Sequence, residues 1–221
     1  MGSILVGGRL YSVLGPVHRG DETGLETTIG RGARKRRRKI DLGVWHWTGG
    51  EGDAFTLFNV LKKRELGVEF FIDRAGEIYQ FCDPALVDTF DAGWVNARSV
   101  GVEIANYGWR KRNGATPVVP AKGRKRPLYS TILNRRSWVF AHFWPVQIAA
   151  AISLAEALSK ALKFPLAVPR GASGFVHPNT MDSGIVDGFS GHLGHFHVNR
   201  KKLDPGLDLL QAFQAAWCDE L

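Results

Sequence analysis

The sequence predicts an α/β fold, a single domain in which about three helices flank a mixed central β-sheet. Several short segments alternate apolar and polar residues, which is typical of strands, whereas residues 145–163 repeat apolar residues at helical spacing. Strand-like and helix-like segments are interleaved along the chain. This order favours helices packed on a partly parallel sheet.

The first clear strand is predicted over residues 42–48. Val44, His46 and Thr48 share one face of this strand, and two tryptophans lie on its other face. Asp53 then offers an N-cap to a helix that we expect to end near residue 66.

Two β-rich runs, residues 68–72 and 77–81, are joined by a short turn that ends in Gly76, and they predict a hairpin. Residues 99–105 predict a further strand. Val100 and Val102 share one of its faces, so Glu103 lies on the other face.

The second half of the chain begins with a predicted surface excursion over residues 108–137, which contain three prolines and two basic clusters. Pro145 opens the amphipathic helix, and Pro205 opens a last helix. Between these helices we expect a loop over residues 165–190 and a short strand over residues 195–198.

The composition is that of an ordinary globular protein, because 44% of the 221 residues are hydrophobic and 23% are charged. No stretch approaches the ~18 consecutive apolar residues of a membrane span. The first residues lack the basic start and apolar run of a secretory signal, so we expect synthesis in the cytoplasm. Cys82 and Cys218 are too few for a disulfide framework.

The net charge of +8 comes mostly from one run, which begins at Arg31 and ends at Lys39. Its seven basic side chains leave +1 for the rest of the chain. Such a run is either a solvated arm or a contact for a polyanion, since Coulombic attraction carries no sequence information. We expect residues 1–39 to form a poorly structured arm with one or two strands, ahead of a domain over residues 40–221.

Three of the seven histidines, His192, His195 and His197, fall within six positions. Residues two apart in a strand point the same way, so His195 and His197 would face one site. Together with Asp204 they offer the imidazole and carboxylate ligands that zinc favours. The alternative is a group of surface histidines beside an Asp–Lys ion pair.

His46 and Glu103 are further candidates for chemistry. A histidine between two tryptophans is often a packed core residue, although it can also be a metal ligand. A carboxylate in a β-rich strand is either a structural charge or, if burial raises its pKa, a good proton shuttle. Taken singly, neither residue shows which of its two interpretations is correct.

Five short blocks taken together resemble one protein family. In chain order they are residues 45–48 (WHWT), 68–80 (VEFFIDRAGEIYQ), 92–96 (AGW with Asn96), 99–104 (SVGVEI) and 194–206 (GH, then K-x-D-P-G). This series is similar to the zinc-dependent N-acetylmuramoyl-L-alanine amidases, a type shared by phage lysozyme-like amidases, bacterial muropeptide amidases and peptidoglycan recognition proteins. The resemblance runs from about residue 42 to residue 210.

The resemblance implies the fold of these amidases and a Zn²⁺ site with His46, His195 and Asp204 as ligands. It also implies that Glu103 is the general acid/base and that Lys202 stabilises the developing oxyanion. The chemistry of the residues agrees with these roles. Two neutral imidazoles and one carboxylate leave a zinc site at net +1, enough to lower the pKa of a bound water toward ~7.

The chain departs from the family at two places. Residues 68–69 replace a Tyr or Ser that precedes a His in many relatives, so Glu103 would have to do the proton work. Asp91 stands where a His usually precedes Ala-Gly. The second histidine ligand also has two alternatives, because His192 likewise follows a glycine and His197 is two residues from the favoured position.

The function implied is hydrolysis of the lactyl–L-alanine amide of peptidoglycan. A long basic run has little use on a small substrate, so we expect a bacteriolytic, phage-type endolysin, made as a monomer in the host cytoplasm and acting on the wall after release. Residues 31–39 would then contact an anionic cell-envelope polymer. The alternatives are a muropeptide-recycling amidase, a non-catalytic peptidoglycan-binding module and a nucleic-acid-binding protein. The presence of all three candidate zinc ligands disfavours the binding module. The concentration of positive charge in one run disfavours the nucleic-acid-binding protein.

Overall fold

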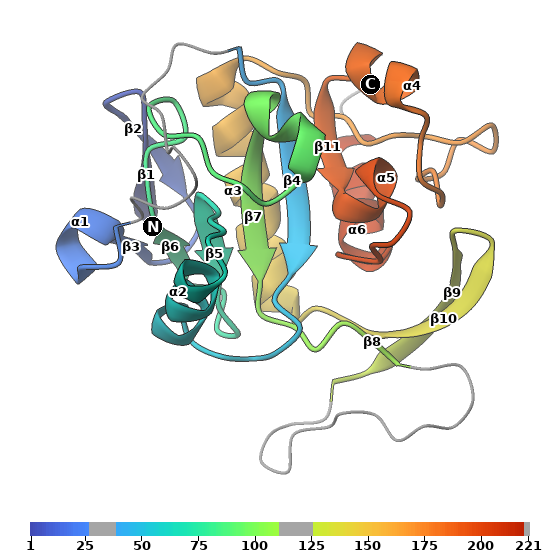
Figure 1. The fold of residues 1–221 in the computed structure, drawn as a ribbon, viewed down its shortest axis with the longest axis horizontal. Coiled ribbons are helices and arrows are strands. Elements are labelled where there is room, and N and C mark those ends of the chain that lie inside the picture. The colour runs from blue at the N-terminus through green and yellow to red at the C-terminus, as the bar shows by residue number, and fades with distance from the viewer. Residues whose placement is uncertain (27–38, 111–125, 219–221) are drawn as a thin grey trace.

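A six-stranded mixed sheet forms the centre of the molecule in the computed structural model, which describes residues 1–26, 39–110 and 126–218 (Figure 1). In spatial order its strands are β11 (Gly191–Gly194), β4 (Leu42–Trp47), β7 (Ser99–Ile104), β5 (Phe70–Ile72), β6 (Ile78–Gln80) and β3 (Val17–Arg19). The first four are parallel, β6 runs antiparallel to β5, and β3 is parallel to β6. The predicted mixed sheet with flanking helices is therefore confirmed.

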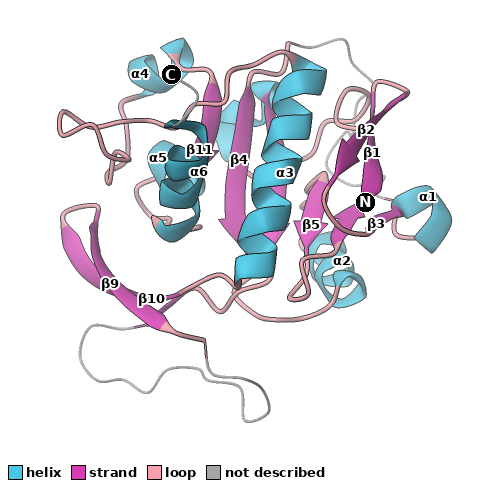
Figure 2. Ribbon diagram, turned by 180° about the vertical axis from the view of Figure 1, so that it is seen from behind, coloured by secondary structure: helices cyan, strands magenta, loops and turns pink. Residues whose placement is uncertain are grey.

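Helices cover both faces of the sheet. Figure 2 shows α3 (Pro145–Leu162) along one face with α6 (Asp208–Cys218) beside it, and α2 (Ala54–Lys63) lies on the opposite side. Val100, Val102 and Ile104 of β7 belong to the same apolar cluster as α3, so the predicted alternation in this strand is confirmed. Phe71 of β5 packs instead in the cluster that contains α2.

The N-terminal segment is better ordered than the sequence suggested. Strands β1 (Gly2–Val6) and β2 (Arg9–Val13) form a hairpin, β3 joins the main sheet, and α1 (Gly20–Thr23) follows. Ile4 and Val13 are buried in the apolar cluster that includes α3. The expectation of a poorly structured arm is thus wrong for residues 2–23, because their apolar side chains complete the core. The basic residues 31–38 lie outside the described residues, and the functional boundary at residue 40 stays a prediction.

The predicted surface excursion over residues 108–137 is also partly wrong. Strands β8 (Trp109–Arg110), β9 (Leu128–Leu133) and β10 (Arg136–Ala141) form a separate three-stranded antiparallel sheet, which projects from the body in Figure 1. Exposed and less exposed side chains alternate along β9, as expected for a strand. The prolines and basic residues that flank it favoured the prediction of a loop instead. Residues 111–125 lie outside the described part of the chain.

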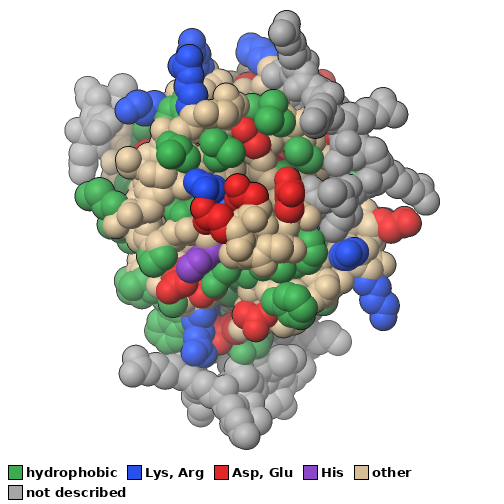
Figure 3. Space-filling view, turned by 90° about the vertical axis from the view of Figure 1, so that its left-hand side faces the viewer, with side chains coloured by type: hydrophobic (Ala, Val, Ile, Leu, Met, Phe, Trp, Pro, Cys, Tyr) green, Lys and Arg blue, Asp and Glu red, His purple; other side chains and the backbone are tan. Residues whose placement is uncertain are grey.

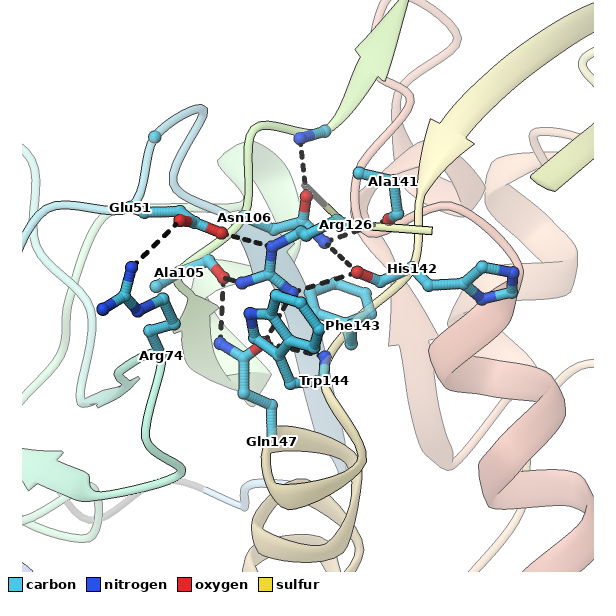
Figure 4. A network of polar contacts seen from close by, with 12 residues as sticks. Glu51, Arg74, Ala105, Asn106, Arg126, Ala141, His142, Phe143, Trp144 and Gln147 are labelled. Carbon is cyan, nitrogen blue, oxygen red and sulfur yellow. Dashed lines mark hydrogen bonds and ion pairs between the residues drawn. The ribbon is translucent and has the colours of Figure 1, made fainter. Parts of the chain in front are cut away.

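Arg126, which the sequence placed in that surface excursion, is buried (Figure 4). Its guanidinium donates to the carbonyl oxygen of Ala105 at 2.9 Å and to Oε1 of Gln147 at 2.9 Å, pairs with Glu51, and lies over the ring of Trp144 at 5.0 Å. A buried guanidinium is tolerated only when such partners replace water. The network ties the loop after β4 and the residue after β7 to the start of α3.

The C-terminal region contains a second correction. We predicted a strand over residues 195–198, but these residues form helix α5 (His195–Val198). The strand of this region is β11 (Gly191–Gly194), which ends immediately before the helix. The expected loop before it contains α4 (Ser183–Gly188), and the last helix begins at Asp208 rather than at Pro205. None of the helices in the described segments is both long and apolar enough to span a membrane.

Candidate metal centre

The site is built at the carboxyl ends of the parallel strands. His46 of β4 and Glu103 of β7 are register partners, so both side chains project from the same face of neighbouring strands. The sheet leaves them close to the end of each strand, where ligands usually bind in open α/β sheets.

His195 comes to the same place by a different route. Strand β11 is parallel to β4 with Gly194 opposite Trp45, so the residue after Gly194 emerges beside His46. The rings of His46 and His195 lie 4.5 Å apart between centroids and meet nearly edge to face. Helix α5 begins at this point, and the prediction that His195 and His197 face one site from a strand is therefore wrong.

Asp204 completes the group from the loop that follows α5. Its carbonyl oxygen accepts a hydrogen bond from the backbone N–H of Phe196 at 3.1 Å, which holds the loop against the start of the helix. Its Oδ2 lies 3.0 Å from Nδ1 of His46 and 3.0 Å from Nδ1 of His195. All three side chains are buried, with 3–8% of the residue exposed.

The two alternative histidines serve other purposes. Nδ1 of His192 accepts from the indole of Trp45, and its other ring nitrogen contacts the hydroxyl of Ser159. Nδ1 of His197 accepts from the backbone N–H of Gly194. Burial lowers the pKa of each histidine to about 3, so both are neutral core residues.

His46 lies between two carboxylates. Nε2 of its ring is 2.9 Å from Oδ2 of Asp91, while Nδ1 faces Asp204. A neutral imidazole has only one N–H, so one of these carboxylates must be met by a second proton or by a cation. Burial would lower the pKa of His46, but the hydrogen bonds to Asp204 and Asp91 outweigh it and raise the pKa to about 10 when no cation is present.

His195 and Asp204 differ in charge, because the site favours the neutral form of the imidazole and the ionised form of the carboxyl group. Burial, followed by the nearby His46, lowers the pKa of His195 and keeps its imidazole neutral. Burial opposes ionisation of Asp204, but hydrogen bonds with the two imidazoles lower its pKa below the usual range. The centre therefore offers one carboxylate and one neutral imidazole, and metal binding would release the second ring proton of His46.

The donor set suits zinc. Its ligand atoms all lie within 4.8 Å of one another. Imidazole nitrogen and carboxylate oxygen are common zinc ligands with bonds of about 2.0–2.2 Å, which places neighbouring ligands of a tetrahedral site roughly 3.4 Å apart. The separations of 3.0 Å between the two Nδ1 atoms and Asp204 are close to that spacing.

Glu103 carries one carboxylate oxygen that is free to take part in chemistry. Its Oε2 is buried without a hydrogen-bond partner among the described residues. Burial raises the pKa of Glu103 to about 7, and the positive charges of His46 and Lys202 act in the opposite direction. A carboxyl group with a pKa near neutrality, beside three candidate metal ligands, is suited to proton transfer.

A groove of about 930 Å³ reaches the site at Asp204. Lys202 is exposed and lines this groove, and its charge acts on both Glu103 and His195. Trp47 and Trp138 also line the groove. Four further basic side chains line it: Arg135, Arg136, Arg200 and Lys201. All five residues expected at the site from the sequence therefore lie at or beside this centre.

Asp91 is the residue that sequence reasoning missed. The sequence showed Asp91 in place of the His that usually precedes Ala-Gly in the family. Nothing in the sequence indicated which side chain the aspartate would contact. The structure buries its carboxylate against His46.

A comparison with family models matches residues 36–207 to a model described as N-acetylmuramoyl-L-alanine amidase. None of the curated proteins matches this chain.

Solved structures of similar fold include the endolysin N-acetylmuramoyl-L-alanine amidase LysCS from Clostridium intestinale, with a TM-score of 0.56 and 14% identity over 93% of this chain and 97% of that chain. Drosophila peptidoglycan recognition protein SD has a TM-score of 0.50 and 17% identity over 91% and 94% of the two chains. AmpD has a TM-score of 0.50 and 15% identity over 96% and 98%. At these identities the likeness establishes the fold.

Proposed function

Because this chain belongs to the N-acetylmuramoyl-L-alanine amidase family, we propose that it is a zinc-dependent amidase that hydrolyses the lactyl–L-alanine amide of peptidoglycan. The observation that carries the zinc dependence is the position of His46 between two buried carboxylates. A neutral imidazole can donate to only one of them; without a metal a second proton on His46 satisfies the other, and a cation shared with His195 and Asp204 would take the place of that proton.

His46, His195 and Asp204 would hold the zinc ion. When bound, zinc would supply a Lewis acid that polarises the amide carbonyl and favours ionisation of water. Glu103 would accept a proton from the attacking water through its unpaired oxygen and deliver it to the nitrogen of the leaving L-alanine. The C–N bond breaks, the lactyl group becomes a carboxylic acid and the peptide leaves with a free amine.

Lys202 would stabilise the oxygen of the tetrahedral intermediate. Its ammonium is exposed in the groove and acts electrostatically on Glu103, so its charge reaches the reacting groups. A cation placed where negative charge develops lowers the barrier without itself exchanging a proton.

We further propose that the substrate is polymeric peptidoglycan and that the protein acts as an endolysin. The basic run over residues 31–39 supports this, because a dense positive charge gains far more from a polyanionic envelope than from a small muropeptide. A muropeptide-recycling amidase has the same chemistry and is the second candidate.

Two assays on the zinc-loaded full chain separate these substrates. We expect clearing of turbid suspensions of purified sacculi, with free L-alanine-terminated peptides appearing in the supernatant. Cleavage of soluble anhydro-muropeptides without any clearing of sacculi would reject the endolysin role and leave the amidase chemistry intact. Absence of cleavage of either substrate would favour a non-catalytic peptidoglycan-binding module.

Nucleic-acid binding is disfavoured by the distribution of charge. Outside residues 31–39 the chain carries a net charge of +1. On the side of the molecule that bears α1, acidic and basic side chains are intermixed in the described part of the surface (Figure 3). Neutralising residues 34–39 should weaken binding to walls, and any binding of the intact protein to DNA should show no sequence preference and be lost as the salt concentration rises.

A further inference from the structure

We propose that Asp91 is a positioning residue, which holds the ring of His46 so that its Nδ1 presents a lone pair to the metal. This inference rests on the proposed zinc-dependent function. The contact is short and dry, since Oδ2 of Asp91 lies 2.9 Å from Nε2 of His46 and only 5% of the aspartate side chain is exposed.

The tautomer of His46 follows from this contact. A carboxylate only accepts hydrogen bonds, so Nε2 must carry the proton that is donated to Asp91. Loss of the second ring proton, which metal binding requires, then leaves the lone pair on Nδ1, and Nδ1 is the atom that faces Asp204 and the neighbouring His195. Without Asp91, either tautomer could form and the ring could turn about its side-chain bond.

The loop that carries Asp91 is fixed independently of His46. Oδ1 of Asn96 accepts hydrogen bonds from the backbone N–H groups of Ala92 at 2.7 Å and Asp91 at 3.4 Å. These bonds tie the loop to the 3-10 helix η1 (Gly93–Arg98) that follows it. The aspartate is therefore delivered to the imidazole by a rigid turn.

The sheet also leaves room for this carboxylate. Gly101 of β7 has no side chain, and a Cβ at this position would lie 2.2 Å from Oδ2 of Asp91. Any other residue at position 101 would push the carboxylate off His46. Two separate features, the loop bonds and the missing side chain, thus place Asp91 against one ring nitrogen.

A carboxylate in this position does more than orient the ring. It makes the imidazole a stronger ligand by drawing on its N–H, and it adds a negative charge close to the cation. Loss of such an outer contact typically weakens metal binding by about 10–100-fold.

The test is the zinc dissociation constant, measured by competition with a chromogenic chelator. Asp91→Asn should raise the dissociation constant by about 10–100-fold. Gly101→Ala, which keeps the charge but displaces it, should also raise it. The matched control is Asp187→Asn, at a carboxylate whose side chain is 65% exposed, and its dissociation constant should equal that of the wild type.

An unchanged dissociation constant in Asp91→Asn would overturn the inference, and a lower melting temperature at unchanged zinc affinity would identify a purely structural role. A second measurement needs no variant: in ¹⁵N NMR spectra of the zinc-loaded wild type, Nε2 of His46 should carry the proton. A proton on Nδ1 instead would overturn the inference. Failure of the wild type to bind zinc would overturn the proposed function, whereas zinc binding that ignores position 91 would overturn only the role of Asp91.

Discussion

His46 and Glu103 lie opposite each other on neighbouring parallel strands, and this pairing places the imidazole proposed to bind the metal beside the carboxylate proposed to accept the proton. The register of β4 and β7 alone fixes which two residues meet. Because side chains alternate between faces, a shift of one residue would send one of them to the opposite side of the sheet, against α3. The chemistry of the site is thus set by strand pairing, and each partner can be tested separately.

Replacement of Glu103 by alanine should separate catalysis from metal binding. Glu103→Ala should retain zinc and lose about 10²–10⁴-fold in turnover, the usual contribution of a general acid/base. Turnover and zinc content are measured on the same preparation, with Glu156→Ala on the exposed side of α3 as the control. Activity retained by Glu103→Ala would assign the proton transfer to another group, with Lys202 or Glu69 next in line.

The pKa of Glu103 should depend on the metal. Burial raises it to about 7 in the metal-free protein, which leaves the carboxyl about half protonated at neutral pH. A bound cation favours the carboxylate, so the pKa should fall on zinc binding. Carboxyl ¹³C titration, assigned by comparison with Glu103→Gln, measures both values. A metal-free pKa close to the ordinary value of about 4.3 would contradict the assignment.

The cation at position 202 should matter more than its neighbour. Lys202→Ala should reduce kcat by about 10–10³-fold with little change in zinc content, because it removes charge stabilisation from the transition state. Lys201→Ala is the matched control, since Lys201 is also exposed in the groove. Equal losses in the two variants would indicate general attraction of the substrate rather than a role at the oxyanion.

Buried His192 should make the fold sensitive to acid. Its pKa is about 3 when folded because of burial, against about 6.5 when unfolded, so its contribution to stability is present above pH 6.5 and is lost as the pH falls. Between pH 7 and pH 5 this loss amounts to about 2 kcal/mol. Urea unfolding of the metal-free protein at both pH values should show that much less pH dependence in His192→Gln. Equal pH dependence in the two proteins would contradict a neutral, buried His192.

Much of the fold could be predicted because local patterns agree with the tertiary structure. The alternation of Val100 and Val102 and the Asp53 cap, whose side chain accepts from the backbone N–H of Thr56, both appear in the structure. The N-terminal hairpin was harder to predict, because it is stabilised by packing against residues that are distant in the sequence. Ile4, for example, packs in the same cluster as α3.

The site shows the same division. The order of the motifs predicted that His46, His195 and Asp204 lie at one site. The strand predicted at His195 was wrong, because the pattern of a strand and that of a short helix cannot be distinguished over four residues. The resemblance favoured His195 over His192 and His197 but left both alternatives open, and only the hydrogen bonds of those two rings show that they are occupied in the core. The partner of Asp91 could not be predicted, since it depends on how a loop folds back over Gly101.

The zinc content of the purified protein tests the central claim most directly. Elemental analysis of the wild type should find one zinc ion per chain, and His46→Ala should lose the metal and the amidase activity together. A wild-type protein that is active without zinc, or a His46→Ala variant that keeps stoichiometric zinc, would contradict the metal centre.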